Sequence, residues 1–334
     1  MITINGWFRR WIGRACLVII ISNSSFLIPN LASAQTLTLV ELNCENLFDC
    51  SHDSLKQDQE WLPASVRQWT PARYWRKVNS IGQEIISCST ESLPDLVALV
   101  EVENDSVLRD LTRRSLLRNA GYEFLMTSSP DVRGIDVALL YQPFSFRPVC
   151  YECLGIQPLE GMRPTRDILY VQGETLRGDT LHIFVVHAPS RFGGEKATRA
   201  NRRIVMERLI NAVRRLPPEA KIIVAGDFND YADSPSLQFL EQHGLRNISR
   251  RAQGRHGAAS GTYRYEGRWQ SIDHILVSPS LLGTVDSVYV NDAPFLLEED
   301  KTYGGLRPLR TYHGYRYQRG FSDHLPLVAR FRFE

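Results

Sequence analysis

The sequence has no apolar stretch long enough to cross a membrane. A shorter apolar run lies near its N-terminus. A spanning helix needs about 20 mostly apolar residues, whereas polar residues at 22–25 interrupt the run that starts at residue 15. Three arginines precede this run, and Ala32-Ser33-Ala34 follows it as a small-x-small cleavage pattern. This arrangement predicts a secretory signal peptide at residues 1–34. We therefore expect a secreted or periplasmic protein without stable membrane insertion after cleavage.

The chain also lacks a strong charge of either sign. Its formal net charge is +2, but Arg9, Arg10 and Arg14 are the only charged residues before Gln35, so the remainder carries −1. Proteins that coat nucleic acid without sequence preference usually have a clear basic excess. The composition thus argues against tight non-specific DNA binding, although it leaves local contacts to phosphate open.

Cysteine is scarce, with six residues in the chain and five after the predicted cleavage site. An odd number cannot all pair internally. Cys150 and Cys153 would lie about 10 Å apart in a regular strand, so they could bridge only across a turn. No second Cys or His pair has the spacing of a zinc site. Repeats and linker-like tracts are also missing, so residues 35–334 are expected to form one domain.

The apolar residues predict a mixture of strands and helices. Helices are expected at 72–88, 106–119 and 194–216, with a short one opening at Ser234-Pro235. Strands are expected at 36–42, 95–102, 135–141, 146–151, 167–172, 180–187, 221–225, 262–265, 274–278, 287–290 and 325–333. Several strands follow one another directly, which favours packed sheets covered by helices over a Rossmann sheet or a TIM barrel. Residues 291–320 show no period, and long ordered loops of this kind are often functional.

Acidic, amide and histidine side chains stand at the ends of the apolar runs. Because buried strands end at a sheet edge, we expect these side chains to form one site. They offer hard oxygen ligands for a divalent cation, a carboxylate that can activate water, and a carboxylate–histidine pair, which together suit phosphate-ester chemistry. The residues are Asn43, Glu101, His187, Asp227, Asn229, Asp273, Asp323 and His324.

At these fragments the chain resembles the endonuclease/exonuclease/phosphatase superfamily, which includes deoxyribonucleases, abasic-site endonucleases, inositol polyphosphate phosphatases and bacterial sphingomyelinases. The most specific part is Gly-Asp-Phe-Asn at 226–229, followed far downstream by Ser-Asp-His at 322–324. The matching fragments run in the family's order from Asn43 to His324. The resemblance implies an α/β (α+β) fold, a four-layer α/β/β/α sandwich with two central mixed β-sheets.

The resemblance also implies a site for Mg²⁺, with Mn²⁺ or Ca²⁺ as alternatives. Glu101 matches the principal metal ligand of the family. Asn43 matches an asparagine near the metal and the scissile phosphate. Glu45 stands where some members place a second acidic contact, and Asp323 resembles a further carboxylate of the metal site.

The remaining motif residues match catalytic positions of the family. Asp227 would orient or deprotonate the attacking water, and Asn229 would donate a hydrogen bond to the phosphate. Asp273 and His324 would form the carboxylate–histidine pair, in which the acid fixes the imidazole and stabilises its charged form. His187 would bind phosphate oxygens.

Substrate contacts are predicted at Asn43 and at three arginines. Arg191 has the side chain for a bidentate phosphate contact, with a solvated loop charge as the equal alternative. Arg307 and Arg310 belong to the segment 291–320, whose arginine and aromatic residues suit phosphates and stacked bases. Asp136 lies where relatives place residues at the cleft edge. His274 is left out of the site because neighbouring residues of a strand point to opposite faces.

We expect a secreted Mg²⁺-dependent hydrolase that attacks a phosphoester in line with water, in the first place a nuclease. The alternative is a phosphatase or phosphodiesterase acting on inositol phosphates, sugar phosphates or lipid head groups. A catalytically inactive binding module is a third hypothesis, but such a relative should have lost at least one motif residue. The expected partner is nucleic acid or another phosphoester substrate, and the expected state is a monomer.

Overall fold

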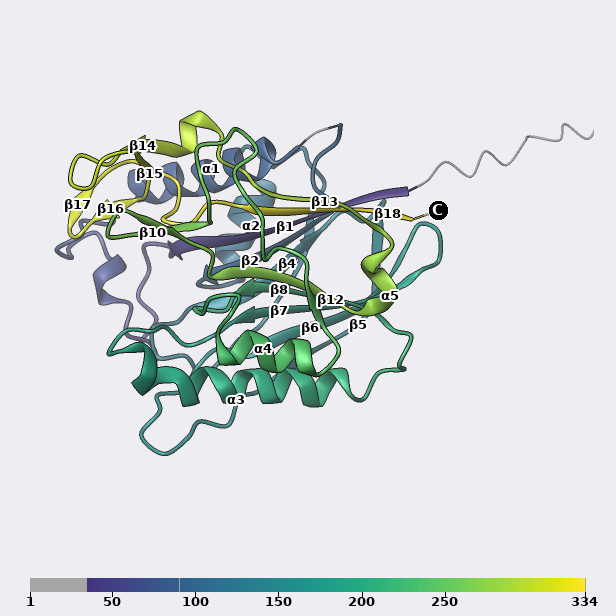
Figure 1. Cartoon of the computed structure of the whole chain (residues 1–334). Helices are drawn as coiled ribbons and strands as arrows, with labels where there is room; N and C mark the ends of the chain where they lie inside the picture. Colours follow the sequence, from purple (N-terminus) through teal and green to yellow (C-terminus); the bar gives the residue numbers. More distant parts are fainter. Residues whose placement is uncertain (1–34, 90, 334) are drawn as a thin grey trace, which may run out of the picture. The chain divides into compact units, whose positions relative to one another are not determined.

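Two mixed β-sheets lie face to face at the centre of the fold (Figure 1). The computed structural model describes residues 35–89 and 91–333, and the predicted signal peptide lies outside them. Sheet A has the strand order β13 (Val285–Val290), β18 (Leu327–Phe333), β1 (Gln35–Leu47), β2 (Leu96–Val102), β4 (Asp136–Tyr141) and β3 (Glu123–Met126). Sheet B has the order β5 (Phe146–Leu154), β6 (Ile168–Thr175), β7 (Thr180–His187), β8 (Lys221–Asp227), β12 (Asp273–Val277) and β9 (Arg246–Asn247). The pairs β1–β2 and β7–β8 are parallel, and the other pairs of both sheets are antiparallel.

Helices cover the outer face of each sheet. α1 (Pro71–Ser87) and α2 (Asp105–Arg113) pack on sheet A, and α3 (Glu195–Val213) and α4 (Pro235–Gln242) pack on sheet B (Figure 1). The short elements α5 (Pro279–Leu282), η1 (Gln59–Trp61) and η2 (Pro294–Leu296) complete the helices of the described residues. The layers follow one another as helix, sheet, sheet and helix, which confirms the predicted fold class.

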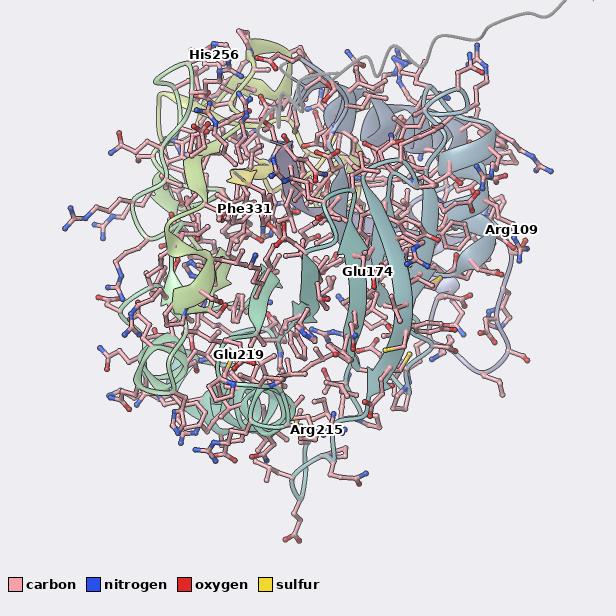
Figure 2. All side chains as sticks on the ribbon, turned by 90° about the vertical axis from the view of Figure 1, so that its right-hand side faces the viewer. Arg109, Glu174, Arg215, Glu219, His256 and Phe331 are labelled. Carbon is pink, nitrogen blue, oxygen red and sulfur yellow. The ribbon has the colours of Figure 1, made fainter. Side chains whose placement is uncertain are left out.

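The central strands bury both faces because they lie between the other sheet and a layer of helices. In β1, Leu37 and Leu39 pack between the sheets, whereas Val40 and Leu42 pack beneath the helices of sheet A. The layer between the sheets also contains Phe331, which is labelled in Figure 2. Burial on both faces explains why the strands are nearly continuous apolar runs in the sequence.

The second helix is shorter than its sequence pattern predicts. The prediction placed it at 106–119, but α2 ends at Arg113. Beyond that point the hydroxyl of Ser115 bonds to the carbonyl of Leu111, and the amide of Leu117 donates to the same hydroxyl at 3.0 Å. These local side-chain bonds satisfy the backbone in a turn and replace the next helical bonds.

The segment 291–320 forms two short hairpins in place of a structureless loop. β14 (Leu297–Glu299) pairs with β15 (Leu306–Pro308), and β16 (Tyr312–His313) pairs with β17 (Arg316–Tyr317). A third hairpin joins β10 (Tyr263–Tyr265) to β11 (Arg268–Gln270). Strands of two or three residues are too short to show an alternating pattern, so the first two hairpins could not be predicted from the sequence.

The five described cysteines are all free, and Cys150 and Cys153 are exposed on the edge strand β5. Within the described ranges, every helix is too short or too polar to span a bilayer.

Candidate active site

The register of sheet B places three of the predicted site residues side by side. His187 ends β7 and lies opposite Asp227, which ends the parallel strand β8. Asp273 begins the antiparallel strand β12 and also lies opposite Asp227. Because parallel strands end at the same edge and β12 starts there, His187 and Asp273 flank Asp227 on its two sides. This edge is the expected site.

Bulges in sheet A direct two further acids toward this edge. The pairing of β1 with β2 shifts register between Asn43 and Leu47, and Glu45 has a φ of 48°. The pairing of β2 with β4 shifts register around Glu101, which has a φ of 61°. A bulge re-aims a side chain, and a left-handed non-glycine residue costs about 1–2 kcal/mol. Backbone strain of this kind is typical of functional positions.

The side chains at this edge surround a cavity of about 980 Å³. Eight of the predicted site residues line it: Asn43, Glu101, His187, Arg191, Asp227, Asn229, Asp323 and His324. Asp273 lies behind His324, and Glu45 and Arg310 lie behind Asp323. Arg307 is not brought to the cavity, because it forms an ion pair with Glu298 across the β14–β15 hairpin at 2.9 Å.

Asp227 is held by three amide donors in the deepest part of the site. Its Oδ1 accepts from the backbone amide of Asn229 at 2.7 Å. Its Oδ2 accepts from the side-chain amides of Asn43 at 3.1 Å and Asn229 at 3.2 Å. Burial, and then the negative charge of Asp273, raise the pKa of Asp227 to about 7. A carboxylate with this pKa takes up a proton readily at neutral pH, as a general base requires.

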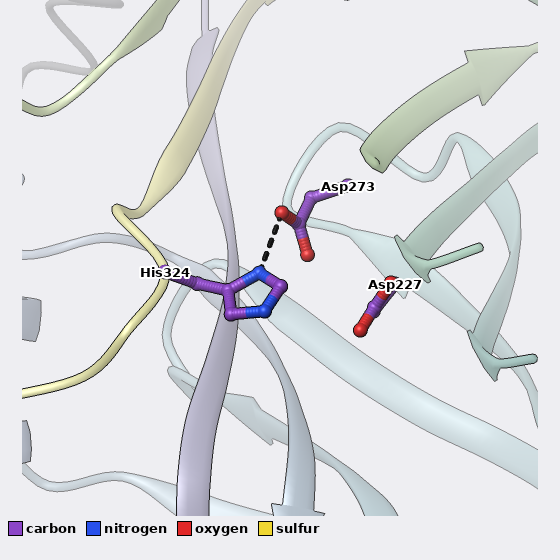
Figure 3. A group of neighbouring side chains, drawn as sticks. All are labelled: Asp227, Asp273 and His324. Atoms are coloured by element: carbon purple, nitrogen blue, oxygen red, sulfur yellow. Dashed lines mark hydrogen bonds and ion pairs between the residues drawn. The ribbon is translucent and has the colours of Figure 1, made fainter. Parts of the chain in front are cut away.

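Asp273 and His324 form the predicted carboxylate–histidine pair (Figure 3). Nδ1 of His324 lies 2.8 Å from Oδ2 of Asp273, and the hydroxyl of Thr262 donates to the same oxygen. Burial alone would lower the pKa of His324, but the charge and hydrogen bond of Asp273 raise it well above its ordinary value. The imidazole is therefore positively charged and faces the cavity beneath the ring of Tyr263, 4.8 Å away.

His187 differs from His324 in its charge. Burial, and then the positive charges of Arg166 and Arg133, lower the pKa of His187 well below its ordinary value, so the ring is neutral. Its Nε2 lies 3.8 Å from both Glu101 and Asp227. A neutral imidazole between two carboxylates can bind a phosphate oxygen as a hydrogen-bond donor.

Glu101 is the carboxylate of the site that is best suited to a metal ion. Its Oε2 accepts from the backbone amide of Asn46 at 2.9 Å, while Oε1 has only longer contacts, 3.4 Å to Arg133 and 3.8 Å to His187. Asn43 and Asp323 line the same cavity and add hard oxygen atoms. Oxygen donors of this kind are the ligands of Mg²⁺ and Ca²⁺.

A second group of potential ligands consists of Asp227, Asp273 and His324, whose ligand atoms lie within 4.8 Å of one another. Here the hydrogen bond to Asp273 occupies Nδ1 of His324, and the raised pKa keeps that ring protonated. Metal ligation requires a neutral imidazole. His324 therefore supplies the positive charge of this group itself, and the metal site is better placed at Glu101.

Two residues considered for the site, Asn229 and Asp136, have contacts that the sequence did not predict, and a third, His274, lies as expected. The side-chain amide of Asn229 donates to Asp227 and to the carbonyl of Ala188 at 3.1 Å, so its present partners are protein groups. Asp136 lies outside the cavity lining and accepts from Thr127 at 2.5 Å. His274 points away from the site, as expected, and its Nε2 contacts the carbonyl of Asp230 at 3.0 Å.

Several site residues were missed by the sequence argument. Arg133, Arg163, Arg166 and Tyr263 line the cavity but come from loops or a short hairpin without a motif. Glu41 lies fully buried below the site, and neither carboxylate oxygen has a partner among the described residues. Burial, and then the negative charges of Asp273 and Asp227, raise the pKa of Glu41 well above its ordinary value. An acid inside the apolar run before Asn43 was the signal that could have identified it.

The sequence matches the endonuclease/exonuclease/phosphatase family over residues 38–332, and the chain belongs to this family. Members of this family are metal-dependent hydrolases of phosphoester bonds. Among curated proteins, the uncharacterized protein YbhP of Escherichia coli K12 is 28% identical over 165 residues, 49% of this chain and 51% of that protein. The chain thus spans about half the length of this curated relative.

Solved structures share the fold at low sequence identity. An endonuclease/exonuclease/phosphatase family protein of Bacteroides thetaiotaomicron has a TM-score of 0.60 and 17% identity over 90% of this chain and 99% of that chain. A mannosyl-6-phosphatase of the same organism has a TM-score of 0.59 and 18% identity, and the match covers 88% of this chain and 98% of that chain. TDP2 of D. rerio, complexed with a single-strand DNA product, has a TM-score of 0.52 and 17% identity. This match covers 89% of this chain and 98% of that chain.

Proposed function

We propose that this hydrolase is an exported, Mg²⁺-dependent nuclease that cleaves phosphodiester bonds of nucleic acid. The observation that carries the substrate class is the combination of aromatic and guanidinium groups around the cavity. Tyr231, Tyr263 and Tyr265 line it, and the guanidinium of Arg191 lies 4.4 Å from the ring centre of Tyr231. Aromatic faces stack on bases of any sequence, and arginine binds phosphate.

Each site residue then has a defined task. Glu101 and Asn43 would hold the cation, which supplies Lewis-acid stabilisation of the phosphoryl oxygen when bound. Asp227 receives the proton of the attacking water. His187 donates a hydrogen bond to a phosphate oxygen, and the imidazolium of His324 stabilises the negative charge that develops in the transition state.

A phosphatase acting on a small, multiply anionic ester is the second candidate. Four arginines, Arg133, Arg163, Arg166 and Arg191, line the cavity, whereas the chain after residue 34 carries a net charge of −1. Positive charge that is concentrated in a pocket suits a small phosphate ester as well as a nucleic acid strand. The fold shared with a mannosyl-6-phosphatase is consistent with this candidate.

The test is a Mg²⁺ assay of residues 35–334 against single-stranded DNA, RNA, a simple phosphodiester, sphingomyelin, sugar phosphates and inositol phosphates. The proposal expects strand cleavage, its loss with EDTA and its recovery with added Mg²⁺. Arg191→Ala should weaken cleavage about tenfold or more, because it removes a charged contact at the cavity. Arg307→Ala, outside the cavity, is the matched control and should keep wild-type turnover. Turnover of monoesters alone would contradict the nuclease assignment in favour of the phosphatase.

A further inference from the structure

Two acids beside the active site, the buried Glu45 and the partly exposed Asp323, share a cation supplied by the protein. Arg310 lies between β15 and β16, and its Nε donates to Oε1 of Glu45 at 3.2 Å. Its Nη2 donates to Oδ2 of Asp323 at 2.8 Å. We propose that Arg310 takes the place of a second metal ion at these acids, so that the active site holds one divalent cation, at Glu101. This inference rests on the proposed metal dependence.

Glu45 has no free oxygen to offer a metal ion. While Oε1 accepts from Arg310, Oε2 accepts from the backbone amide of Thr311 at 2.6 Å and lies 3.8 Å from Nζ of Lys77. The side chain is 7% exposed and is not part of the cavity lining. Both oxygens of Glu45 thus already accept hydrogen bonds from the protein, and the carboxylate does not face the cavity in which a metal ion would bind. Glu45 is accordingly not among the ligands of the proposed ion.

The charges around Glu45 and Asp323 are already balanced. Lys77 has a fully buried side chain, and its Nζ donates to Oγ1 of Thr311 at 2.7 Å and to the carbonyl of Phe321. Two cations, Lys77 and Arg310, thus face two carboxylates. A divalent cation added here would leave buried positive charge without a partner, which is strongly unfavourable.

On the cavity side, Oε1 of Glu101 has only long contacts with protein groups. Nη2 of Arg133 approaches it at 3.4 Å, with a side chain that is 47% exposed to solvent, and Nε2 of His187 lies 3.8 Å away. This oxygen is therefore available to a divalent cation, so the ion belongs at Glu101.

The experiment counts Mn²⁺ ions bound to residues 35–334 by calorimetric titration and by electron paramagnetic resonance of free Mn²⁺. The wild type should bind one ion per chain, and Glu101→Gln should weaken this binding at least tenfold. Arg310→Met should bind two, because Glu45 and Asp323 lose their guanidinium. Arg310→Lys restores the charge and should return the number to one. A single ion in folded Arg310→Met would overturn the proposal.

Glu45→Gln decides the question if Arg310→Met does not fold. Because Glu45 is no metal ligand, this variant should bind one Mn²⁺ with wild-type affinity. Loss of an ion, or affinity weakened tenfold, would show that Glu45 ligates metal and would overturn the proposal. No substrate is present in these titrations, so a wrong substrate class in the hydrolysis assay leaves the ion count interpretable.

Discussion

Asp227 combines the position and the protonation behaviour of a general base. It lies between His187 and Asp273 in the register of sheet B, and its pKa is raised to about 7. In an asparagine at this position, the side-chain oxygen can still accept from the side-chain amides of Asn43 and Asn229, and only the bond from the backbone amide of Asn229 is lost. Substitution should therefore affect the chemistry far more than the fold.

Asp227→Asn is expected to lower kcat by about a hundredfold or more, because it removes the proton acceptor. The measurement is hydrolysis of the preferred phosphoester at saturating Mg²⁺, with thermal unfolding of the same samples. Asp233→Asn, an exposed acid on the following loop, is the matched control and should keep full activity. Wild-type turnover in Asp227→Asn would remove Asp227 from the mechanism.

Glu84 shows how a buried acid links stability to pH. It lies fully buried on α1, and neither carboxylate oxygen has a partner in the described part of the chain. Burial raises the pKa of Glu84 to about 8, against the opposing charge of Lys77. An unfolded glutamate titrates near about 4.3, so the folded state binds this proton more tightly. Its contribution to stability is therefore complete at low pH and is lost as the pH rises to about 8.

Glu84→Gln should abolish this loss, because a neutral amide does not titrate. Between about pH 5 and pH 8 the free energy of unfolding of the wild type should fall relative to the variant by about 1 kcal/mol per pH unit. Urea unfolding at both ends of this range measures the difference. Glu207→Gln, half-exposed on α3, is the control and should track the wild type. Parallel stability curves for Glu84→Gln and the wild type would contradict the prediction.

At the scale of elements, the close approach of β7 and β8 depends on a glycine. Gly226 lies within β8, opposite Val186 of β7. Its φ is 153°, and a Cβ atom added there would lie 1.8 Å from the carbonyl oxygen of Val186. The residue thus keeps the strand ends close enough for His187 and Asp227 to share one site.

Gly226→Ala should destabilise the protein by about 3 kcal/mol or more, or prevent folding, because backbone atoms must move to admit the methyl group. Soluble yield and the urea midpoint measure the effect. Gly283→Ala is the matched control, since nothing lies within 4 Å of the added Cβ. Its stability should stay within about 0.5 kcal/mol of the wild type. Equal urea midpoints for Gly226→Ala and Gly283→Ala would contradict the prediction, because they would show that β7 and β8 can move apart to admit the methyl group without loss of stability.

At the scale of the whole molecule, export would separate residues 1–34 from the enzyme. The described strand β1 begins at Gln35, directly after the predicted cleavage site. Expression of the full chain in a bacterial host should give an exported protein whose mass begins at Gln35. Ala34→Arg should block cleavage because the pattern requires a small residue, whereas Ala34→Ser should be processed. The uncleaved mass in all three proteins would refute the signal peptide.

The layered architecture could be predicted from the sequence because burial on both faces produces long apolar runs. Motif residues such as Glu101 and Asp227 could be predicted because each follows such a run. The hairpins of residues 291–320 could not, since their strands are too short to show a period. Lys77 stands on the apolar face of α1, a visible irregularity whose meaning depends on its distant partner Thr311.

By itself the sequence determined the fold class, the family and the chemistry of the strand ends, because local patterns of burial and motif order carry that information. Only the tertiary structure decided which acids remain available to a metal ion. Arg310 and Glu45 are 265 positions apart, and no local pattern connects them. Their contact, and the absence of Arg307 from the cavity, follow from how the short hairpins pack against the end of β1. Charge balance in a buried site is a property of the assembled neighbours, so it emerges only when the chain is folded.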